Sequence, residues 1–221
     1  MIRYANAGDL EQIRLLWEIC FPDDSGFNDY FFENLFSLEN VLLFEENERI
    51  HAMTQMIPRR LKMSSEITEP CTYIYGACTH PDYRRQHLMA QLLERSFVLD
   101  RSLGRKASIL IPAEPWLFGF YRKFDYLPVF MLNTKEIYVS CSDTQTLSML
   151  SADDIGQISS LYNDLLTDRI PYLVREHTEW KKQIEMFFML GLGCFGIFAE
   201  DGTLDGYAFA WKPDGGVVYI Q

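Results

Sequence analysis

Two adjacent arginines before an expected helix are the residues with the clearest chemical use. The segment THPDYRRQHLMAQLLERS, residues 79–96, places Arg84 and Arg85 just ahead of apolar residues that recur at helical spacing. The first amides of a helix lack intrahelical acceptors, and the helix dipole is positive at that end. Arginine adds forked donors that suit phosphate oxygens. The pattern therefore predicts an anion site, with a pyrophosphate as the expected ligand, although the charges alone also fit a solvated loop.

The elements around the arginines should form a strand–helix–strand crossover. The strand CTYIYGACT, residues 71–79, precedes them, and the nearly all-apolar ASILIP, residues 107–112, follows the helix. Gly104 stands where a glycine would end that helix. A buried apolar strand after a helix is typical of parallel pairing, and such crossovers are right-handed.

A second motif, FGFYRKFDYLPV, occupies residues 118–129, after Pro115 at the first turn of a helix expected over residues 115–124. Taken in order, the two motifs resemble those of the GNAT acetyltransferase superfamily. The matching residues of the first motif are His80, Pro81, Tyr83, Arg84 and Arg85. Those of the second motif are Phe120, Tyr121, Lys123 and Tyr126.

The resemblance implies a site for acetyl-CoA, which serves as the acyl-donating cosubstrate in that superfamily. It implies that main-chain groups at the end of the fourth strand hold the pantetheine arm, and those residues are Ala77, Cys78 and Thr79. It implies that the turn and the helix start hold the pyrophosphate, through Arg84, Arg85, Gln86, His87, Leu88, Met89 and the adjoining Ala90. It also places Tyr121 where a tyrosine protonates the departing thiolate, a role that suits a pKa near ~10.

Three positions depart from the glycines of the superfamily motifs: His87 and Met89 in the phosphate turn, and Asp125 after FYRKF. His87 is tolerated if the position is helical, because its amide binds and its side chain turns away. If φ is positive there, histidine is among the residues that are least penalised. Asp125 can occupy a left-handed turn at modest cost. We expect these three replacements to weaken the affinity for acetyl-CoA and to leave the resemblance to the superfamily intact.

Composition limits the partners. The chain has 221 residues and a formal net charge of −11, which argues against a nucleic-acid or anionic-membrane surface and favours a polycationic acceptor. Five scattered cysteines without a CxxC pair indicate a reducing compartment. The four histidines lack ligand spacing, so no metal is expected. The N-terminus does not resemble a signal peptide, and we expect a cytoplasmic protein.

The fold class that follows is α/β (α+β), with the mixed central sheet of the GNAT fold and then a partial second copy. We place a GNAT domain at residues 1–140 and a degenerate second GNAT-like domain at residues 141–221, where SADDIGQISSLYNDLL repeats the pattern of the first helix. This tandem resembles the enhanced-intracellular-survival type of acetyltransferase. The second half is expected to wall the acceptor pocket, with its aromatic residues in its own core.

The expected activity is transfer of an acetyl (acyl) group from acetyl-CoA to a primary amine of a small molecule or peptide. The alternative is a catalytically silent acyl-CoA-binding sensor or scaffold, which the lost glycines favour and Tyr121 opposes. Aminoacyl transfer from tRNA is disfavoured by the acidic charge. We name no general base, since Glu33, Glu39, Glu114 and His51 suit surface or structural roles. The oligomeric state is open, with a homo-oligomer as one alternative.

Overall fold

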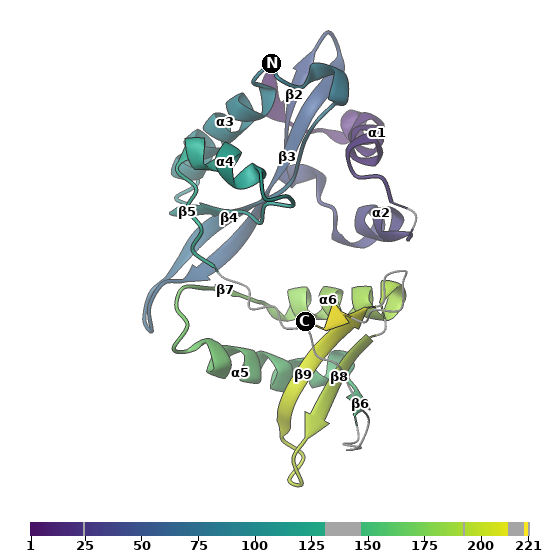
Figure 1. The fold of residues 1–221 in the computed structure, drawn as a ribbon, viewed down its shortest axis with the longest axis vertical. Helices are drawn as coiled ribbons and strands as arrows, with labels where there is room; N and C mark the ends of the chain where they lie inside the picture. The colour runs from purple at the N-terminus through teal and green to yellow at the C-terminus, as the bar shows by residue number, and fades with distance from the viewer. Residues whose placement is uncertain (24, 131–146, 192, 212–218, 221) are drawn as a thin grey trace. The chain divides into compact units, whose positions relative to one another are not determined.

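The computed structural model describes residues 1–23, 25–130, 147–191, 193–211 and 219–220 (Figure 1). The chain forms two compact units. The first comprises Met1–Tyr126 with Ile170–Val174, and the second comprises Leu127–Arg169 with Arg175–Gln221. The domain boundary predicted at residues 140–141 lies outside the described residues, as does most of the strand region expected over residues 127–140.

A mixed sheet organises the first unit. Its strands run in the order β1-β2-β3-β4-β5, and β7 pairs with β3. Neighbours are antiparallel except β4 and β5, which are parallel. Asn47 and Glu48, both at positive φ, close the hairpin between β2 and β3, as a tight two-residue turn requires. The strand bounds are Ile2–Tyr4 (β1), Val41–Glu46 (β2), Arg49–Lys62 (β3), Thr68–Thr79 (β4), Ala107–Ile109 (β5) and Tyr172–Val174 (β7).

Helices cover both faces of this sheet (Figure 1). Alternate strand residues point to opposite sides: Leu43 and Met53 join the cluster beneath α1, whereas Leu42 and Met56 join the cluster beneath α3 and α4. The helices on the first face are α1 (Leu10–Cys20) and α2 (Phe27–Tyr30), the latter continued by a π-helical turn over Phe31–Leu35. Those on the second face are α3 (Leu88–Ser102) and α4 (Leu117–Tyr121), the latter continued by a 3-10 turn over Arg122–Phe124.

Helix α3 ends as its sequence predicts. Gly104 has φ +71°, and its amide donates to the Arg101 carbonyl over 3.2 Å. The Arg105 amide donates to the Asp100 carbonyl over 2.9 Å. These two bonds form a Schellman motif, which satisfies the last carbonyls of the helix and turns the chain toward β5.

The described residues of the second unit form a four-stranded antiparallel sheet in the order β10-β9-β8-β6 and two α-helices. From Ser148 onward it repeats the order at the start of the first unit, with a short strand, a capping box and a helix: Ser151 and Asp154 form the box here, as Asn6 and Asp9 do in the first unit. Trp180 and Phe209 lie in its core at 1% and 2% exposure. The element bounds are Ser148–Met149 (β6), Ile155–Leu166 (α5), His177–Leu190 (α6), Gly193–Phe198 (β8), Leu204–Trp211 (β9) and Tyr219–Ile220 (β10).

Candidate active site

The predicted crossover is present, and its two strands pair over only a short stretch. Residues Cys71–Tyr73 of β4 pair with Ala107–Ile109 of β5. In the described part of the chain, β4 then continues to Thr79 with no partner on that side, while its other edge stays paired with β3. The row from Ile74 to Thr79 therefore presents main-chain donors and acceptors at an open edge. Ala77, Cys78 and Thr79, predicted to hold the pantetheine arm, lie in this row.

A bulge at Gly76 shapes this part of β4. The ladder with β3 pairs Cys78 with Met53 and then Tyr75 with Gln55, so β4 carries an extra residue between them. Gly76 has φ +58°, a conformation that favours glycine. Bulges bend the strand that carries them, so this one alters the course of β4 where its pairing with β5 has ended.

The turn after β4 is fixed by contacts to the strand pair. The His80 amide donates to the His51 carbonyl over 2.8 Å, and the Tyr83 ring stacks on the His51 ring at 3.7 Å between centroids. Arg84 Nε donates to the Thr79 carbonyl over 3.4 Å. His51, which we considered from the sequence as a general base and did not choose, is 4% exposed, and these contacts give it a structural role in the turn.

Helix α3 begins at Leu88, so Arg85, Gln86 and His87 form the turn in front of it. Both Arg85 and His87 have positive φ, at 64° and 60°. His87 therefore adopts the left-handed conformation and not the helical one. Glycine adopts this conformation without strain, which explains why the superfamily motif has glycine at this position. Asp125 likewise has φ 63°.

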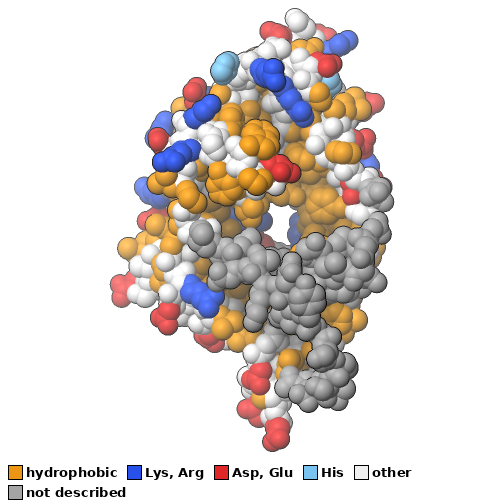
Figure 2. Space-filling view, in the orientation of Figure 1, with side chains coloured by type: hydrophobic (Ala, Val, Ile, Leu, Met, Phe, Trp, Pro, Cys, Tyr) orange, Lys and Arg blue, Asp and Glu red, His pale blue; other side chains and the backbone are white. Residues whose placement is uncertain are grey.

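The start of α3 has the features of an anion site. The amides of Leu88, Met89 and Ala90 lack intrahelical acceptors because they lie in the first turn, and the N-cap residue His87 makes no side-chain hydrogen bond to them. The side chains of Arg84 and Arg85 are exposed beside it. In Figure 2, Lys and Arg side chains are spread over the part of the first unit that carries α3 and α4. Main-chain donors, the helix dipole and two guanidinium groups fit a diphosphate.

Tyr121, the predicted proton donor, lies at the end of α4. It is 8% exposed and belongs to the same hydrophobic cluster as Leu88, the first residue of α3. Its ring makes edge contacts with Phe120 and Tyr126. Burial raises the pKa of Tyr121 above its ordinary value of 10, so the phenol is neutral at physiological pH. The structure thus brings the two sequence motifs together at one side of the sheet.

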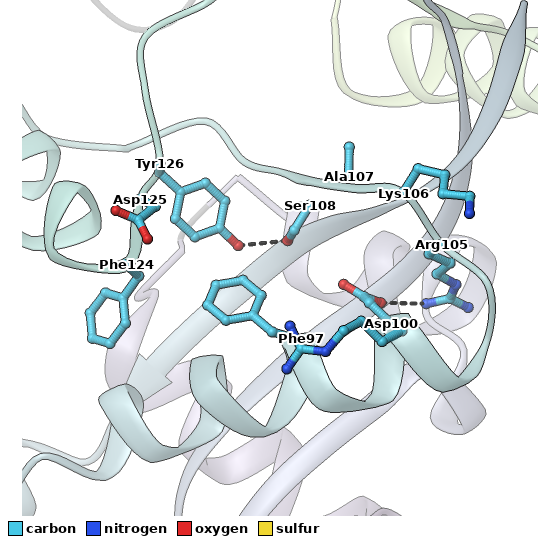
Figure 3. Close-up of a pocket in the computed structure, with 10 residues that line it drawn as sticks. Phe97, Asp100, Arg105, Lys106, Ala107, Ser108, Phe124, Asp125 and Tyr126 are labelled. Carbon is cyan, nitrogen blue, oxygen red and sulfur yellow. Dashed lines mark hydrogen bonds and ion pairs between the residues drawn. The ribbon is translucent and has the colours of Figure 1, made fainter.

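A separate cavity of about 230 Å³ lies near the other end of α3 (Figure 3). Sequence reasoning did not predict it. Asp100 faces it, with one carboxylate oxygen 3.5 Å from Arg105 Nη1 and accepting from the Thr72 hydroxyl. Across the cavity, Ser108 and Tyr126 share a hydrogen bond of 2.6 Å. Neither the arginine turn nor Tyr121 lines it, so we do not assign the predicted cofactor site to this cavity.

Comparison with known families defines the class. Residues 1–129 match the acetyltransferase (GNAT) domain family. Because this match covers more than half of the chain, the chain belongs to that family.

Solved structures share its fold. A conserved protein of unknown function from Enterococcus faecalis V583, described as a probable N-acyltransferase, has a TM-score of 0.73 at 15% identity. The superposition covers 97% of this chain and 55% of that one. A GCN5-related N-acetyltransferase from Anabaena variabilis has a TM-score of 0.71 at 16% identity, covering 100% of this chain and 57% of that one. Eis1 from Mycobacterium abscessus has a TM-score of 0.63 at 14% identity, covering 97% and 54%.

The chain spans a little more than half the length of these structures. No curated protein matches its sequence. Among the described residues, no helix has the length and apolar character needed to cross a bilayer.

Proposed function

We propose that the chain transfers an acyl group, most simply acetyl, from acyl-CoA to a primary amine. One observation carries the proposal: β4 continues past its last pair with β5, and the turn over residues 80–87 then leads to a helix start that has no side-chain cap among the described residues. The open strand edge and the helix start follow one another along the chain, as an extended ligand with a terminal diphosphate requires. Membership in the GNAT family supports the same ligand.

Different segments of the chain would bind different parts of acyl-CoA. Main-chain groups of Ala77, Cys78 and Thr79 would hold the pantetheine arm. The amides from Arg85 to Ala90 and the guanidinium of Arg84 would hold the diphosphate. An amide of the open strand edge would polarise the thioester carbonyl as the amine attacks it, which is where negative charge develops.

Tyr121 would give its proton to the departing thiolate. Its raised pKa keeps the proton on the phenol at rest, so the donor is present whenever the amine attacks. Burial is the cause of this shift, and no side-chain hydrogen bond of a described residue contributes to it. The acceptor is proposed to be a polycation, because a net charge of −11 favours the approach of cations at low salt.

A thiol-release assay tests the proposal. Purified protein with acetyl-CoA and a panel of polyamines and lysine peptides should release free coenzyme A. Tyr121→Phe should slow this release by about 100-fold, the lower end of the range for general acid–base catalysis, without weakening acetyl-CoA binding measured by calorimetry.

Tyr126→Phe is the matched control, because Tyr126 is a neighbouring aromatic whose hydroxyl is already bonded to Ser108. It should retain turnover if Tyr121 is the specific donor. Tight acetyl-CoA binding with no turnover on any amine would instead identify a silent binding module. Failure to bind acetyl-CoA would contradict the proposed function.

A further inference from the structure

Two cysteines from distant parts of the first unit meet beside the open end of β4. Cys20 is the last residue of α1, and Cys78 lies in β4. Cys20 packs against the hydrophobic cluster that contains Cys78, so both side chains lie on the face of the sheet that α1 covers. The Cys20 thiol also contacts the Thr79 carbonyl at 3.6 Å.

Arg84 completes this cluster. Its Nε contacts the same Thr79 carbonyl as the Cys20 thiol, which brings the guanidinium beside the sulfur. The contact with Cys78 and the nearby Arg84 charge lower the pKa of Cys20 to about 7. Burial keeps the pKa of Cys78 well above its usual range. At neutral pH a substantial fraction of Cys20 is therefore thiolate, whereas Cys78 remains a thiol.

Exposure distinguishes the two sulfurs. Cys20 is only partly buried, whereas Cys78 is 7% exposed. A small oxidant therefore reaches Cys20 first. The buried Cys71 and Cys194 differ from this pair, because burial raises the pKa of Cys71 to about 11 and that of Cys194 to about 12.

We propose that Cys20 and Cys78 form an oxidisable dithiol site whose substrate is a small peroxide. The Cys20 thiolate attacks a peroxide oxygen, which breaks the O–O bond, yields a sulfenic acid on Cys20 and, with hydrogen peroxide, releases hydroxide. The Cys78 sulfur then attacks the Cys20 sulfur and displaces its hydroxyl, which takes the Cys78 proton and leaves as water, while the hydroxide of the first step takes up the proton that Cys20 lost when it ionised. In sum, two thiols and one hydrogen peroxide give one disulfide and two waters.

The site adjoins the proposed cofactor edge, because Cys78 and Thr79 belong to the strand row assigned to the pantetheine arm. A disulfide would fix the end of α1 to that row. This consequence rests on the proposed function, and we expect the oxidised protein to bind acetyl-CoA at least tenfold more weakly than the reduced protein. The formation of the disulfide itself does not depend on the proposed function.

Thiol counting and peptide mapping test the site. After treatment of the full chain with a small excess of hydrogen peroxide at pH 7, the thiols counted in denaturant should fall from five to three. Non-reducing peptide mapping should link Cys20 to Cys78 and leave Cys71 and Cys194 unmodified. Cys78→Ala should stop the reaction at a Cys20 sulfenic acid, which a dimedone probe traps, and Cys20→Ser should keep Cys78 reduced.

Other outcomes would overturn the proposal. Oxidation of Cys71 or Cys194 as fast as Cys20, or a linkage between two molecules in place of the Cys20–Cys78 bond, would remove the site. If a variant fails to fold, the wild-type map alone decides. Unchanged acetyl-CoA binding after disulfide closure would overturn the link to the cofactor edge. Failure of the reduced protein to bind acetyl-CoA would count against the proposed function and leave the dithiol standing.

Discussion

The indole of Trp17 occupies the space where residue 76 would carry a side chain. A β-carbon built on Gly76 would stand 2.3 Å from Trp17 Cζ3, far inside van der Waals contact. Trp17 is itself held by stacking on Phe31, at 4.5 Å between ring centroids, and by its indole N–H, which donates to Asn28 over 2.8 Å. The glycine that forms the bulge in β4 is therefore required by helix α1 as well as by its own φ.

Gly76→Ala should destabilise the first unit by about 2–5 kcal/mol. A left-handed non-glycine residue costs about 1–2 kcal/mol, and forcing a methyl group into a packed site adds about 1–3 kcal/mol. Gly104→Ala is the matched control, because Gly104 also has positive φ but has nothing within 4 Å of the added carbon. It should lose only about 1–2 kcal/mol. Urea denaturation measures both, and equal losses would show that Trp17 moves aside without cost.

His87 offers a test of whether backbone or side chain serves the turn. His87→Gly should change the free energy of unfolding by less than about 1 kcal/mol, because relief of the left-handed strain offsets the added chain entropy. His87→Val should be clearly less stable, since a β-branched residue is an outlier at φ 60°. If amides hold the diphosphate, the glycine variant binds acetyl-CoA at least as tightly as wild type. A tenfold weakening in that variant would show that the imidazole contacts the ligand.

The crossover and the helix bounds of α3 could be predicted because apolar spacing and Gly104 specify them locally. The backbone conformation of His87 could not be predicted, since the same sequence is compatible with a helical and with a left-handed residue at this position. Only the three-dimensional structure distinguishes the two. Helix α4 is shorter than the expected span of residues 115–124, because the chain tightens into a 3-10 turn before the left-handed Asp125.

Contacts between distant segments explain the other differences. The strand β7 has three residues and no alternating pattern, so its pairing with β3 depends on the tertiary structure. The meeting of Cys20 with Cys78 and the cavity beside Asp100 likewise arise only when α1 and α3 pack against the sheet.

Asp9 and Asp100 are both buried carboxylates, and they should respond to acid in opposite ways. Arg3 holds the pKa of Asp9 below its ordinary value of 3.8 through two hydrogen bonds of 2.6 Å and 2.8 Å. Burial raises the pKa of Asp100, despite its bonds to Thr72 and Arg105. Asp9 therefore adds stability above its unfolded pKa and loses it as the pH falls through the lower folded value. Asp100 costs stability above its folded pKa, and this cost disappears as the pH falls through that value.

Asp9→Asn should lose about 1–3 kcal/mol at pH 7, between the ranges for exposed and buried ion pairs. Its deficit relative to wild type should shrink below pH 3.8. Asp100→Asn should lower the free energy of unfolding at pH 7 by less than Asp9→Asn does. The amide oxygen of the new asparagine still accepts from the Thr72 hydroxyl, and no charge is buried. Denaturant titrations from pH 3 to pH 7 measure both differences. A larger loss for the Asp100 variant at pH 7 would show that its pairing with Arg105 outweighs its burial.

The buried tyrosines predict a loss of stability in alkali. Burial raises the pKa of Tyr75 to about 12 and also raises the pKa of Tyr121 and Tyr126. A group whose folded pKa exceeds its unfolded value contributes stability below the unfolded pKa of 10 and loses it as the pH rises toward the folded value. Stability should therefore fall between about pH 10 and 12.

Tyr75→Phe keeps the ring contacts with Trp17 and Phe31 and removes one ionisable group. The free energy of unfolding of this variant should therefore decrease less above pH 10 than that of wild type. Urea denaturation at pH 7 and pH 11 measures this difference, and an equal fall in both proteins would show that ionisation of Tyr75 does not oppose folding.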